Sequence, residues 1–237
     1  MLAIIPARAG SKGVPGKNKA LIAGRPLVDY TVTALERARS VSGIILSTDD
    51  EDILALYRDR PGVLALDRPK RLADDDTATA DVVAHALEEW QALGRDIPDA
   101  LFVAQPITPL RTAADIDAAY ELFKSSGCES LISACRAEGI RHPSGMYRLK
   151  EGEQCATPYL AHPEPTRRQD FETVYQRNGA VYLITTEFFF RTGKLRSDNP
   201  TIYEMPWERS INIDVPGDLL IAKALIESGL GGSDSGS

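Results

Sequence analysis

The sequence predicts an α/β fold in which helices cover both faces of a mainly parallel sheet. Short apolar runs alternate with amphipathic stretches along most of the chain, which is the pattern of right-handed βαβ units. The chain has 237 residues, of which 43% are hydrophobic, and this is enough for one sizeable core. A loop rich in glycine and cationic side chains follows the first apolar run, and folds of this class bind ligands at the carboxyl ends of their strands.

The expected strands are short apolar runs, and the expected helices show apolar side chains at helical spacing. The strands cover residues 3–6, 43–47, 63–66, 100–104, 131–134 and 180–184. One helix is expected after Pro26, a second at 50–57, and a third that includes Val82 to Trp90. A fourth begins at the capping-box-like pair Thr112 and Asp115, and a fifth covers 217–227. The loops after strands, at residues 7–18, 47–50, 105–111 and 212–218, are therefore expected to form the binding site.

The regular alternation breaks between about residues 138 and 178. This stretch contains Pro143, Pro158, Pro163 and Pro165, and it is long for a loop inside a compact domain. We expect a small projecting arm or lid at 138–178, inserted in a single domain that spans residues 1–230. The tail at 231–237 contains only Gly, Ser and Asp, which predicts disorder.

Charge narrows the class of ligand. The net charge of −7 argues against a general nucleic-acid binder. Residues 1–28 nevertheless contain five cationic side chains and no acid, which indicates a specific anionic ligand. The first apolar run is too short for a signal peptide or a membrane span, and the three cysteines lack CxxC spacing. We therefore expect a cytoplasmic protein with no membrane or nucleic-acid partner.

The segment Pro6-Ala7-Arg8-Ala9-Gly10-Ser11-Lys12-Gly13-Val14-Pro15-Gly16-Lys17-Asn18 predicts a phosphate-binding loop. Its glycine spacing fits neither a Walker A loop nor a dinucleotide fingerprint. Glycines still let backbone N–H groups approach oxygen atoms, while a guanidinium can grip phosphate in a fork. The three cations Arg8, Lys12 and Lys17 suit a triphosphate, on which charge builds as pyrophosphate leaves.

An opening of the form IIPAR-x-GSKG-x-PGKN resembles the acylneuraminate (CMP-sialic acid synthetase-like) cytidylyltransferase family. Later segments match the family in order and cover nearly the whole chain. They are Ser47-Thr48-Asp49-Asp50, Arg68-Pro69, Asp75-Asp76-Thr77-Ala78-Thr79, Gln105-Pro106-Ile107-Thr108-Pro109-Leu110-Arg111, Arg168-Gln169, Asn178-Gly179-Ala180 and Ile211-Asn212-Ile213-Asp214.

The resemblance implies a Rossmann-like, nucleotidyltransferase-type sheet, dimerisation through the projecting segment, and Mg²⁺-dependent transfer of CMP from CTP to an acidic acceptor. Residue by residue, it implies catalytic roles for Arg8, Lys12 and Lys17. The nucleotide would lie against Arg8, Ala9, Gly10, Ser11, Asn18, Arg68 and Thr79. The acceptor would lie against Gln105, Arg168, Gln176 and Asn178. The metal would be held by Asp214 and Asn212.

Three departures from the family pattern concern the acceptor and the metal. Gln176 stands where an Arg is usual, and Arg177 would point to the other face of a strand. Ser144, Gly145 and Met146 follow the His142-Pro143 pair, where a basic residue is common. The first metal carboxylate is replaced by Asn212, a weaker ligand for Mg²⁺. The acceptor is therefore expected to be a sialic or nonulosonic acid or a small phosphonate. The missing charge could come from Arg111, Arg141, Arg167, Arg168 or Arg177.

Other interpretations remain open at this point. The chain could be a sugar-1-phosphate nucleotidyltransferase that uses another NTP, since such enzymes share the fold and a similar first loop. It could also be a catalytically weak nucleotide-binding module, because Asn212 weakens the metal site. Asp214 could simply be the N-cap of the last helix, and the lone His142 favours a structural role over that of a base.

Overall fold

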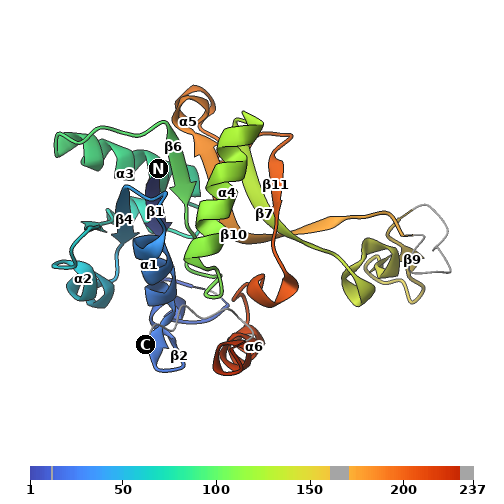
Figure 1. Ribbon diagram of the computed structural model, residues 1–237. Coiled ribbons are helices and arrows are strands. Elements are labelled where there is room, and N and C mark those ends of the chain that lie inside the picture. Colours follow the sequence, from blue (N-terminus) through green and yellow to red (C-terminus); the bar gives the residue numbers. More distant parts are fainter. Residues whose placement is uncertain (12, 161–170, 230–237) are drawn as a thin grey trace.

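The computed structural model describes residues 1–11, 13–160 and 171–229, and it is built around one seven-stranded sheet (Figure 1). The strand order is β11-β7-β10-β6-β1-β4-β5. The strands are β1 (Leu2–Pro6), β4 (Gly43–Thr48), β5 (Val63–Asp67), β6 (Ala100–Val103), β7 (Ser130–Arg136), β10 (Tyr175–Thr185) and β11 (Thr201–Glu204). Only β10 runs antiparallel to its neighbours, so the prediction of a mainly parallel sheet is confirmed.

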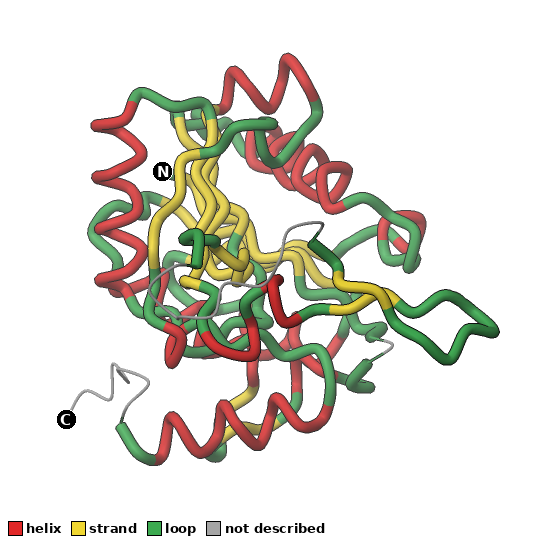
Figure 2. The backbone as a smooth tube through the Cα atoms, turned by 90° about the vertical axis from the view of Figure 1, so that its right-hand side faces the viewer, coloured by secondary structure: helices red, strands yellow, loops and turns green. Residues whose placement is uncertain are grey.

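Helices cover both faces of the sheet, as expected (Figure 2). One face packs against α1 (Leu27–Arg37), α2 (Glu51–Tyr57) and α4 (Ala113–Ser126). The other face packs against α3 (Thr79–Ala92) and α5 (Thr186–Thr192). The alternation of β1 explains how one strand serves both layers, because Ala3 and Ile5 lie in the first core while Leu2 and Ile4 lie in the second.

Local signals explain where the main helices begin. The predicted capping box before α4 is present, since Thr112 Oγ1 accepts a hydrogen bond from the Asp115 amide and the Asp115 side chain accepts one from the Thr112 amide. Asp50 caps α2 through hydrogen bonds from the amides of Asp52 and Ile53. These caps satisfy backbone donors at the helix N-termini that otherwise have no intrahelical partner.

Strand β10 differs from the expectation in length and in regularity. It begins at Tyr175, before the predicted 180–184, and so takes in the last residues of the predicted arm. Its pairing with β7 shifts register between Arg177 and Tyr182, which marks a bulge. The chain leaves along β7 and returns along β10, which explains why this strand is antiparallel. Two later elements, α5 and β11, were not predicted.

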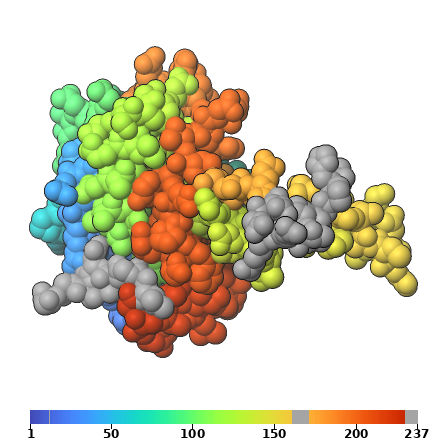
Figure 3. All heavy atoms as spheres, turned by 45° about the vertical axis from the view of Figure 1, so that its right-hand side comes forward, coloured from blue at the N-terminus to red at the C-terminus, as the bar shows by residue number. Residues whose placement is uncertain are grey.

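The segment between β7 and β10 projects from the body of the molecule (Figure 1), and its described residues stand away from the rest in Figure 3. It contains the short antiparallel pair β8 (Tyr147–Arg148) and β9 (Thr157–Pro158). No helix in the described ranges is long and apolar enough to cross a membrane. The predicted disordered tail at 231–237 lies outside the described residues.

A third, smaller core lies at the carboxyl edge of the sheet and supports the glycine-rich loop. Helix α6 (Pro216–Glu227) contributes Ala222, and the segment before it contributes Ile211 and Ile213. These side chains pack against Val14 from the loop and Ile22 from the small hairpin of β2 (Leu21–Ile22) and β3 (Arg25–Pro26). The loop after β1 is therefore supported by residues about 200 positions later in the chain.

Candidate functional site

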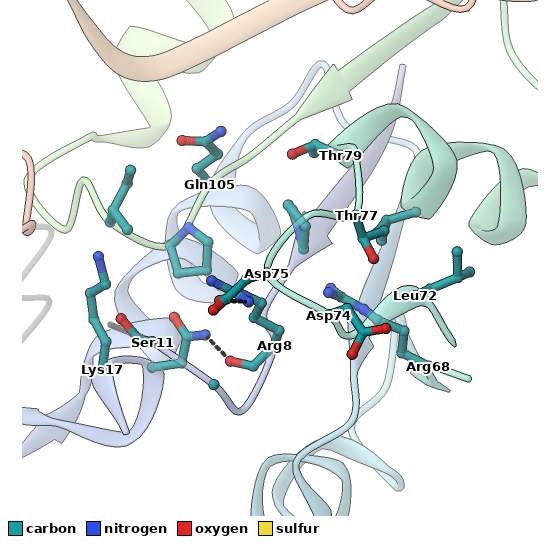
Figure 4. Close-up of a pocket in the computed structure, with 16 residues that line it drawn as sticks. Arg8, Ser11, Lys17, Arg68, Leu72, Asp74, Asp75, Thr77, Thr79 and Gln105 are labelled. Carbon is teal, nitrogen blue, oxygen red and sulfur yellow. Dashed lines mark hydrogen bonds and ion pairs between the residues drawn. The ribbon is translucent and has the colours of Figure 1, made fainter. Parts of the chain in front are cut away.

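A cavity of about 280 Å³ opens at the carboxyl ends of the central strands, where the sequence places its expected binding loops (Figure 4). It brings together most of the residues predicted for the nucleotide and the reaction, together with Gln105 from the predicted acceptor residues. These are Arg8, Gly10, Ser11, Lys17, Asn18, Arg68, Thr79 and Gln105. The third predicted catalytic cation, Lys12, lies outside the described residues.

The loop after β1 is held in place by hydrogen bonds to neighbouring loops and to itself. The Ala9 amide donates to Oδ1 of Asp49 at 2.7 Å, which anchors the loop to the end of β4. Nδ2 of Asn18 donates to the Arg8 carbonyl at 2.9 Å. Gly13 touches the segment before α6, because a Cβ atom there would lie 2.0 Å from the Asp214 carbonyl oxygen. Only glycine fits this close approach.

Arg8 points into the cavity and forms an ion pair with Asp75, with Nη1 2.5 Å from Oδ1 (Figure 4). Asp75 and its neighbour Asp74 lie on the loop before α3, and both line the cavity. Both side chains of the pair are about one-third exposed, so water reaches them. The cavity thus contains carboxylates beside its cations.

Arg68 is the most deeply buried cation of the cavity. Its Nη2 donates to the Ser47 carbonyl at 2.7 Å and its Nε to Ser47 Oγ at 3.1 Å. Burial, opposed by the charge of Asp49 and helped by the nearby charge of Arg8, lowers the pKa of Arg68 to about 10. Arg68 therefore remains positive at neutral pH and adds to the anion-binding potential of the cavity.

Lys17 connects the glycine-rich loop to the predicted metal residues. Its Nζ donates to the Ile213 carbonyl at 2.6 Å and lies 3.6 Å from Oδ1 of Asp214. Asp214 does not cap α6 with its side chain. Instead, Oδ2 of Asp218 accepts hydrogen bonds from the amides of Asp214 and Val215, each at 2.8 Å. The carboxylate of Asp214, which is 65% exposed, is left for contact with Lys17 or a ligand.

Asn212 contributes an oxygen with no hydrogen-bond partner in the described part of the chain, and this Oδ1 is buried. Ile211 and Ile213 pack in the third core, and neither Asn212 nor Asp214 lines the main cavity. The neutral oxygen of Asn212 and the carboxylate of Asp214 are both of the oxygen type that Mg²⁺ takes as ligands. The described residues contain no cluster of three or more His, Cys, Asp or Glu side chains placed to hold a metal.

The predicted acceptor residues are not all found together. Gln105 lines the cavity, whereas Gln176 lies exposed on β10 opposite Cys135 and does not line it. Asn178 is buried and its amide is engaged internally. It donates to Ser210 Oγ at 2.8 Å and accepts from Ser133 Oγ at 2.5 Å, which holds the bulge of β10. Arg168 lies outside the described residues.

The arginines that were expected to supply the missing acceptor charge also lie in different parts of the structure. Arg111 is buried and donates to the Ala180 carbonyl at 2.6 Å and to Thr31 Oγ1 at 2.8 Å, which gives it a structural role. Arg141 stacks on Trp207, and Arg167, like Arg168, lies outside the described residues. Arg177 lines a second cavity that shares Gln105 with the first. In the arm, both ring nitrogens of His142 are hydrogen-bonded, to Ser144 and Glu172, which fits a structural histidine.

Some residues of the site were given no individual role from the sequence, although the loop at 47–50 was expected to belong to it. Ser47 and Asp49 position Arg68 and the glycine-rich loop, while Asp74, Asp75 and Thr77 line the cavity. Ser47 lies near the carboxyl end of β4, and the others lie on the loops after β4 and β5. Their position after these strands was the available signal, but it does not reveal which side chain turns inward.

The chain is similar in sequence to a known protein family. The sequence model of the family described as "Cytidylyltransferase" matches residues 2–205. The chain belongs to the cytidylyltransferase family. The predicted resemblance is thereby confirmed, and the matched region includes every residue of the main cavity.

Several curated proteins are similar to this chain, at about the same sequence identity. The N-acylneuraminate cytidylyltransferase of Streptococcus agalactiae is 28% identical over 225 residues, which are 92% of this chain and 51% of the relative. The chain thus spans about half the length of the curated relatives that it matches first. The CMP-N,N'-diacetyllegionaminic acid synthase of Legionella pneumophila is 28% identical over 96% of both chains. The pseudaminic acid cytidylyltransferase of Campylobacter jejuni is 28% identical over 94% of this chain and 95% of its own.

Solved structures share the cytidylyltransferase fold at low sequence identity. A CMP:2-keto-3-deoxy-manno-octonic acid synthetase complexed with CTP superimposes with a TM-score of 0.69 at 16% identity, covering 96% of this chain and 98% of the other. A 4-diphosphocytidyl-2C-methyl-D-erythritol synthase has a TM-score of 0.65 at 15% identity, with 95% and 98% covered. These matches confirm the predicted nucleotidyltransferase-type fold.

Proposed function

We propose that this protein transfers CMP from CTP to an acidic acceptor and releases pyrophosphate. The observation that carries the proposal is the convergence of Arg8, Lys17 and Arg68 on one cavity at the carboxyl edge of the sheet in a member of the cytidylyltransferase family. The relatives named above are synthases or cytidylyltransferases for acidic sugars. Their names support the same reaction class here.

The triphosphate would lie along the glycine-rich loop. Arg8 and Lys17 reach the cavity from this loop, with Gly10 and Ser11 between them, so the backbone can approach phosphate oxygens closely. Arg68 adds a buried positive charge on the other wall. The nucleotide would compete with Asp75 for Arg8, because the two side chains form an ion pair.

The reaction we propose is an in-line displacement at the α-phosphorus of CTP. An acceptor oxygen forms a new bond to that phosphorus, and the bond to the bridging oxygen breaks with its electron pair leaving on pyrophosphate. Arg8 and Lys17 stabilise the charge that develops on the departing group. A hydroxyl acceptor must also lose its proton, whereas a phosphonate oxygen is already ionised at neutral pH.

We propose that Asp214 and Asn212 hold Mg²⁺, with the unpartnered oxygen of Asn212 and the exposed carboxylate of Asp214 as ligands. When bound, Mg²⁺ would offset negative charge on the triphosphate and orient its oxygens. Lys17 lies beside Asp214 and would keep the phosphate chain close to this pair.

The acceptor is proposed to be a sialic or nonulosonic acid or a small phosphonate. Among the predicted acceptor residues in the described ranges, Gln105 alone lines the main cavity, and it also borders the neighbouring cavity. This position suits a group that contacts the acceptor next to the α-phosphorus.

We further propose that the protein is a homodimer formed through the arm. Apolar side chains on the arm are strongly exposed in a single chain, including Ile140 at 97%, Leu149 at 61% and Tyr147 at 60%. Exposed apolar side chains gathered on one projecting segment are typical of a surface that a partner covers.

The experiment that tests the transfer reaction is pyrophosphate release by the purified protein with CTP, Mg²⁺ and a panel of acidic sugars and phosphonates. Replacing CTP by ATP, GTP or UTP tests nucleotide choice, and omitting Mg²⁺ tests the metal. A Lys17→Met variant is expected to lose activity by about 100-fold or more. Lys223→Met, which removes an exposed charge on α6, serves as the matched control. Equal turnover of all four nucleotides, or full activity of Lys17→Met, would contradict the proposal.

A further inference from the structure

The connection between β11 and α6, residues 205–215, carries the Ile213 carbonyl that accepts the hydrogen bond from Lys17. Apart from one 3₁₀ turn, this connection has no regular secondary structure. Within the described residues, its amides bond to the body near its two ends. The Met205 amide donates to a carbonyl of β7 and the Ile213 amide to the Ile107 carbonyl, each at 2.8 Å. Side-chain contacts therefore fix the course of the connection between these two points.

Arg209 is the first side-chain anchor of the connection. Its Nε donates to Oδ2 of Asp115 at 2.9 Å and its Nη2 to Oδ1 at 2.8 Å, which is the forked geometry that a guanidinium favours. The Asp115 side chain is 2% exposed and lies in the first turn of α4, where it also caps that helix. The carboxylate is thus held by the body of the molecule, and it fixes the position of Arg209.

Ser210 is the second anchor. Nδ2 of the buried Asn178 donates to Ser210 Oγ at 2.8 Å, and Ser210 Oγ donates to the Pro206 carbonyl at 2.8 Å. The Asn178 amide oxygen accepts a hydrogen bond from Ser133 Oγ on β7. The connection is therefore joined to β7 and to the bulge of β10 at one buried point.

The two anchors lie just before the group that Lys17 contacts. Ile211 and Ile213 pack in the third core directly after Ser210, so the chain has little freedom between the anchors and the Ile213 carbonyl. Nζ of Lys17 lies 2.6 Å from that carbonyl oxygen, and the Lys17 side chain is 14% exposed. A displaced connection would move the acceptor of this hydrogen bond and release Lys17.

We infer that Arg209 is a positioning residue of the nucleotide site, and that it acts on Lys17 through the Ile213 carbonyl. The inference rests on the role proposed for Lys17 in the transfer reaction. Arg209 does not line the main cavity, whereas Lys17 does. The fork on Asp115 holds the connection in place, and the connection keeps the Lys17 ammonium at the cavity. Without the fork, Lys17 loses its fixed position and the cavity binds a triphosphate more weakly.

The rate at which an amine-acylating reagent modifies Lys17 measures the first step without any nucleotide. Mass spectrometry follows the modification in the full-length protein, with Lys150 on the arm, 76% exposed, as the internal reference. Arg209→Met is expected to raise the rate at Lys17 about fivefold relative to Lys150, because the hydrogen bond that protects Lys17 is lost. Arg209→Lys keeps the charge without the fork and is expected to raise it about twofold.

Arg60→Met is the matched control. Arg60 also holds a carboxylate, that of Glu36, in a fork, and its side chain is 32% exposed against 28% for Arg209. It does not line the main cavity, so its loss is expected to leave the rate at Lys17 unchanged. An unchanged rate in both Arg209 variants, or an equal rise in Arg60→Met, would overturn the inference.

Calorimetric titration of CTP with Mg²⁺ measures the second step in the parent, Arg209→Met, Lys17→Met and the double variant. Arg209→Met is expected to weaken binding about threefold to tenfold in the parent, and by less than about twofold where Lys17 is already replaced. Two effects that simply multiply would show that Arg209 does not act through Lys17, and would reject the inference. A parent that binds no CTP, yet shows the faster Lys17 modification in Arg209→Met, would retain the control of Lys17 by Arg209 and reject the transfer reaction.

Discussion

Arg8 is paired with a carboxylate at the position where a triphosphate is expected to bind. The ion pair with Asp75 is short and partly exposed, so it contributes little to stability but neutralises a cation of the binding loop. A nucleotide has to break this contact before it gains the charge of Arg8. Asp75 would therefore compete with the proposed nucleotide for Arg8.

Removing this competitor should strengthen nucleotide binding. Asp75→Asn is expected to lower the dissociation constant for CTP by about twofold to fivefold, since partly exposed ion pairs contribute about 0.2–1 kcal/mol. Isothermal titration calorimetry measures the change directly. Asp76→Asn is the control, because the adjacent Asp76 does not line the cavity. Unchanged or weaker binding by Asp75→Asn would mean that Asp75 assists the nucleotide rather than competing with it.

At the residue scale, the sequence identified the cations of the site better than their partners. Arg8 and Lys17 belong to one continuous motif, so their proximity follows from local spacing. The partners Asp75 and Ile213 come from distant loops, and only the folded sheet brings them to these cations. The acceptor residues were harder still to predict, because the Asn178 side chain is hydrogen-bonded within the bulge and Arg177 lines a second cavity.

At the scale of elements, Asp29 joins two helices of the same face. It accepts hydrogen bonds from Arg25 and from Tyr57 at the end of α2, and it forms an ion pair with Arg60. Burial alone would raise the pKa of Asp29, but the hydrogen bonds and charges of these partners lower it below its ordinary value. The carboxylate therefore stays ionised and contributes stability above the pKa that it has in the unfolded chain.

Asp29→Asn is expected to reduce the free energy of unfolding by about 2 kcal/mol at pH 7. Because the pKa of Asp29 is lower in the folded state, its contribution is lost as the pH falls below about 4. The gap between variant and parent should therefore narrow in acid. Urea unfolding at pH 7 and at low pH measures it, with Asp59→Asn on the exposed loop after α2 as the control. A gap of constant size at both pH values would contradict the assigned role.

The contact between the glycine-rich loop and the segment before α6 gives a second prediction at this scale. Gly13→Ala places a methyl group against the Asp214 carbonyl, so one of the two segments must move. We expect a loss of about 1–3 kcal/mol in the free energy of unfolding, as for other overpacked positions. Gly10→Ala is the matched control, since a Cβ atom there meets no atom within 4 Å. Equal stability of the two variants would show that the loop adjusts freely.

Element prediction succeeded where the period was clear, including α6 after the arm, and was incomplete between β10 and α6. The strands and helices up to β7 follow from alternating apolar runs, caps and helical spacing. Elements α5 and β11 were missed because their short segments carry mixed patterns next to an irregular strand. The bulge in β10 could not be predicted from the sequence either, because it depends on hydrogen bonds of Ser133 in the neighbouring strand as much as on Asn178.

At the scale of the whole molecule, the arm exposes apolar side chains that a partner subunit would cover. The sequence predicted a projecting segment from its length and prolines, but which of its side chains are exposed depends on how the short pair β8 and β9 folds back. Leu149 and Ile140 face solvent in a single chain, which supports the proposed homodimer.

Leu149→Asp combined with Ile140→Asp is expected to convert the protein from a dimer to a monomer, because each change places a charge in the proposed interface. Multi-angle light scattering after size exclusion measures the mass, which should fall from twice 25.8 kDa to the mass of one chain. Leu56→Asp is the control, since Leu56 is comparably exposed on α2 of the body. A monomeric parent protein, or a variant that remains dimeric, would reject the arm as the interface.

The third core has a consequence for how the protein is made. Ribosomal synthesis releases the glycine-rich loop before the segment that completes its core, because the packing around Val14 and Ile22 is complete only when Ile211, Ile213 and Ala222 have emerged. Lys17 likewise cannot donate its hydrogen bond to the Ile213 carbonyl until that residue has been synthesised. A nascent chain that already contains every strand of the sheet should therefore still be unable to retain a nucleotide. Nucleotide-binding competence would arrive only with helix α6.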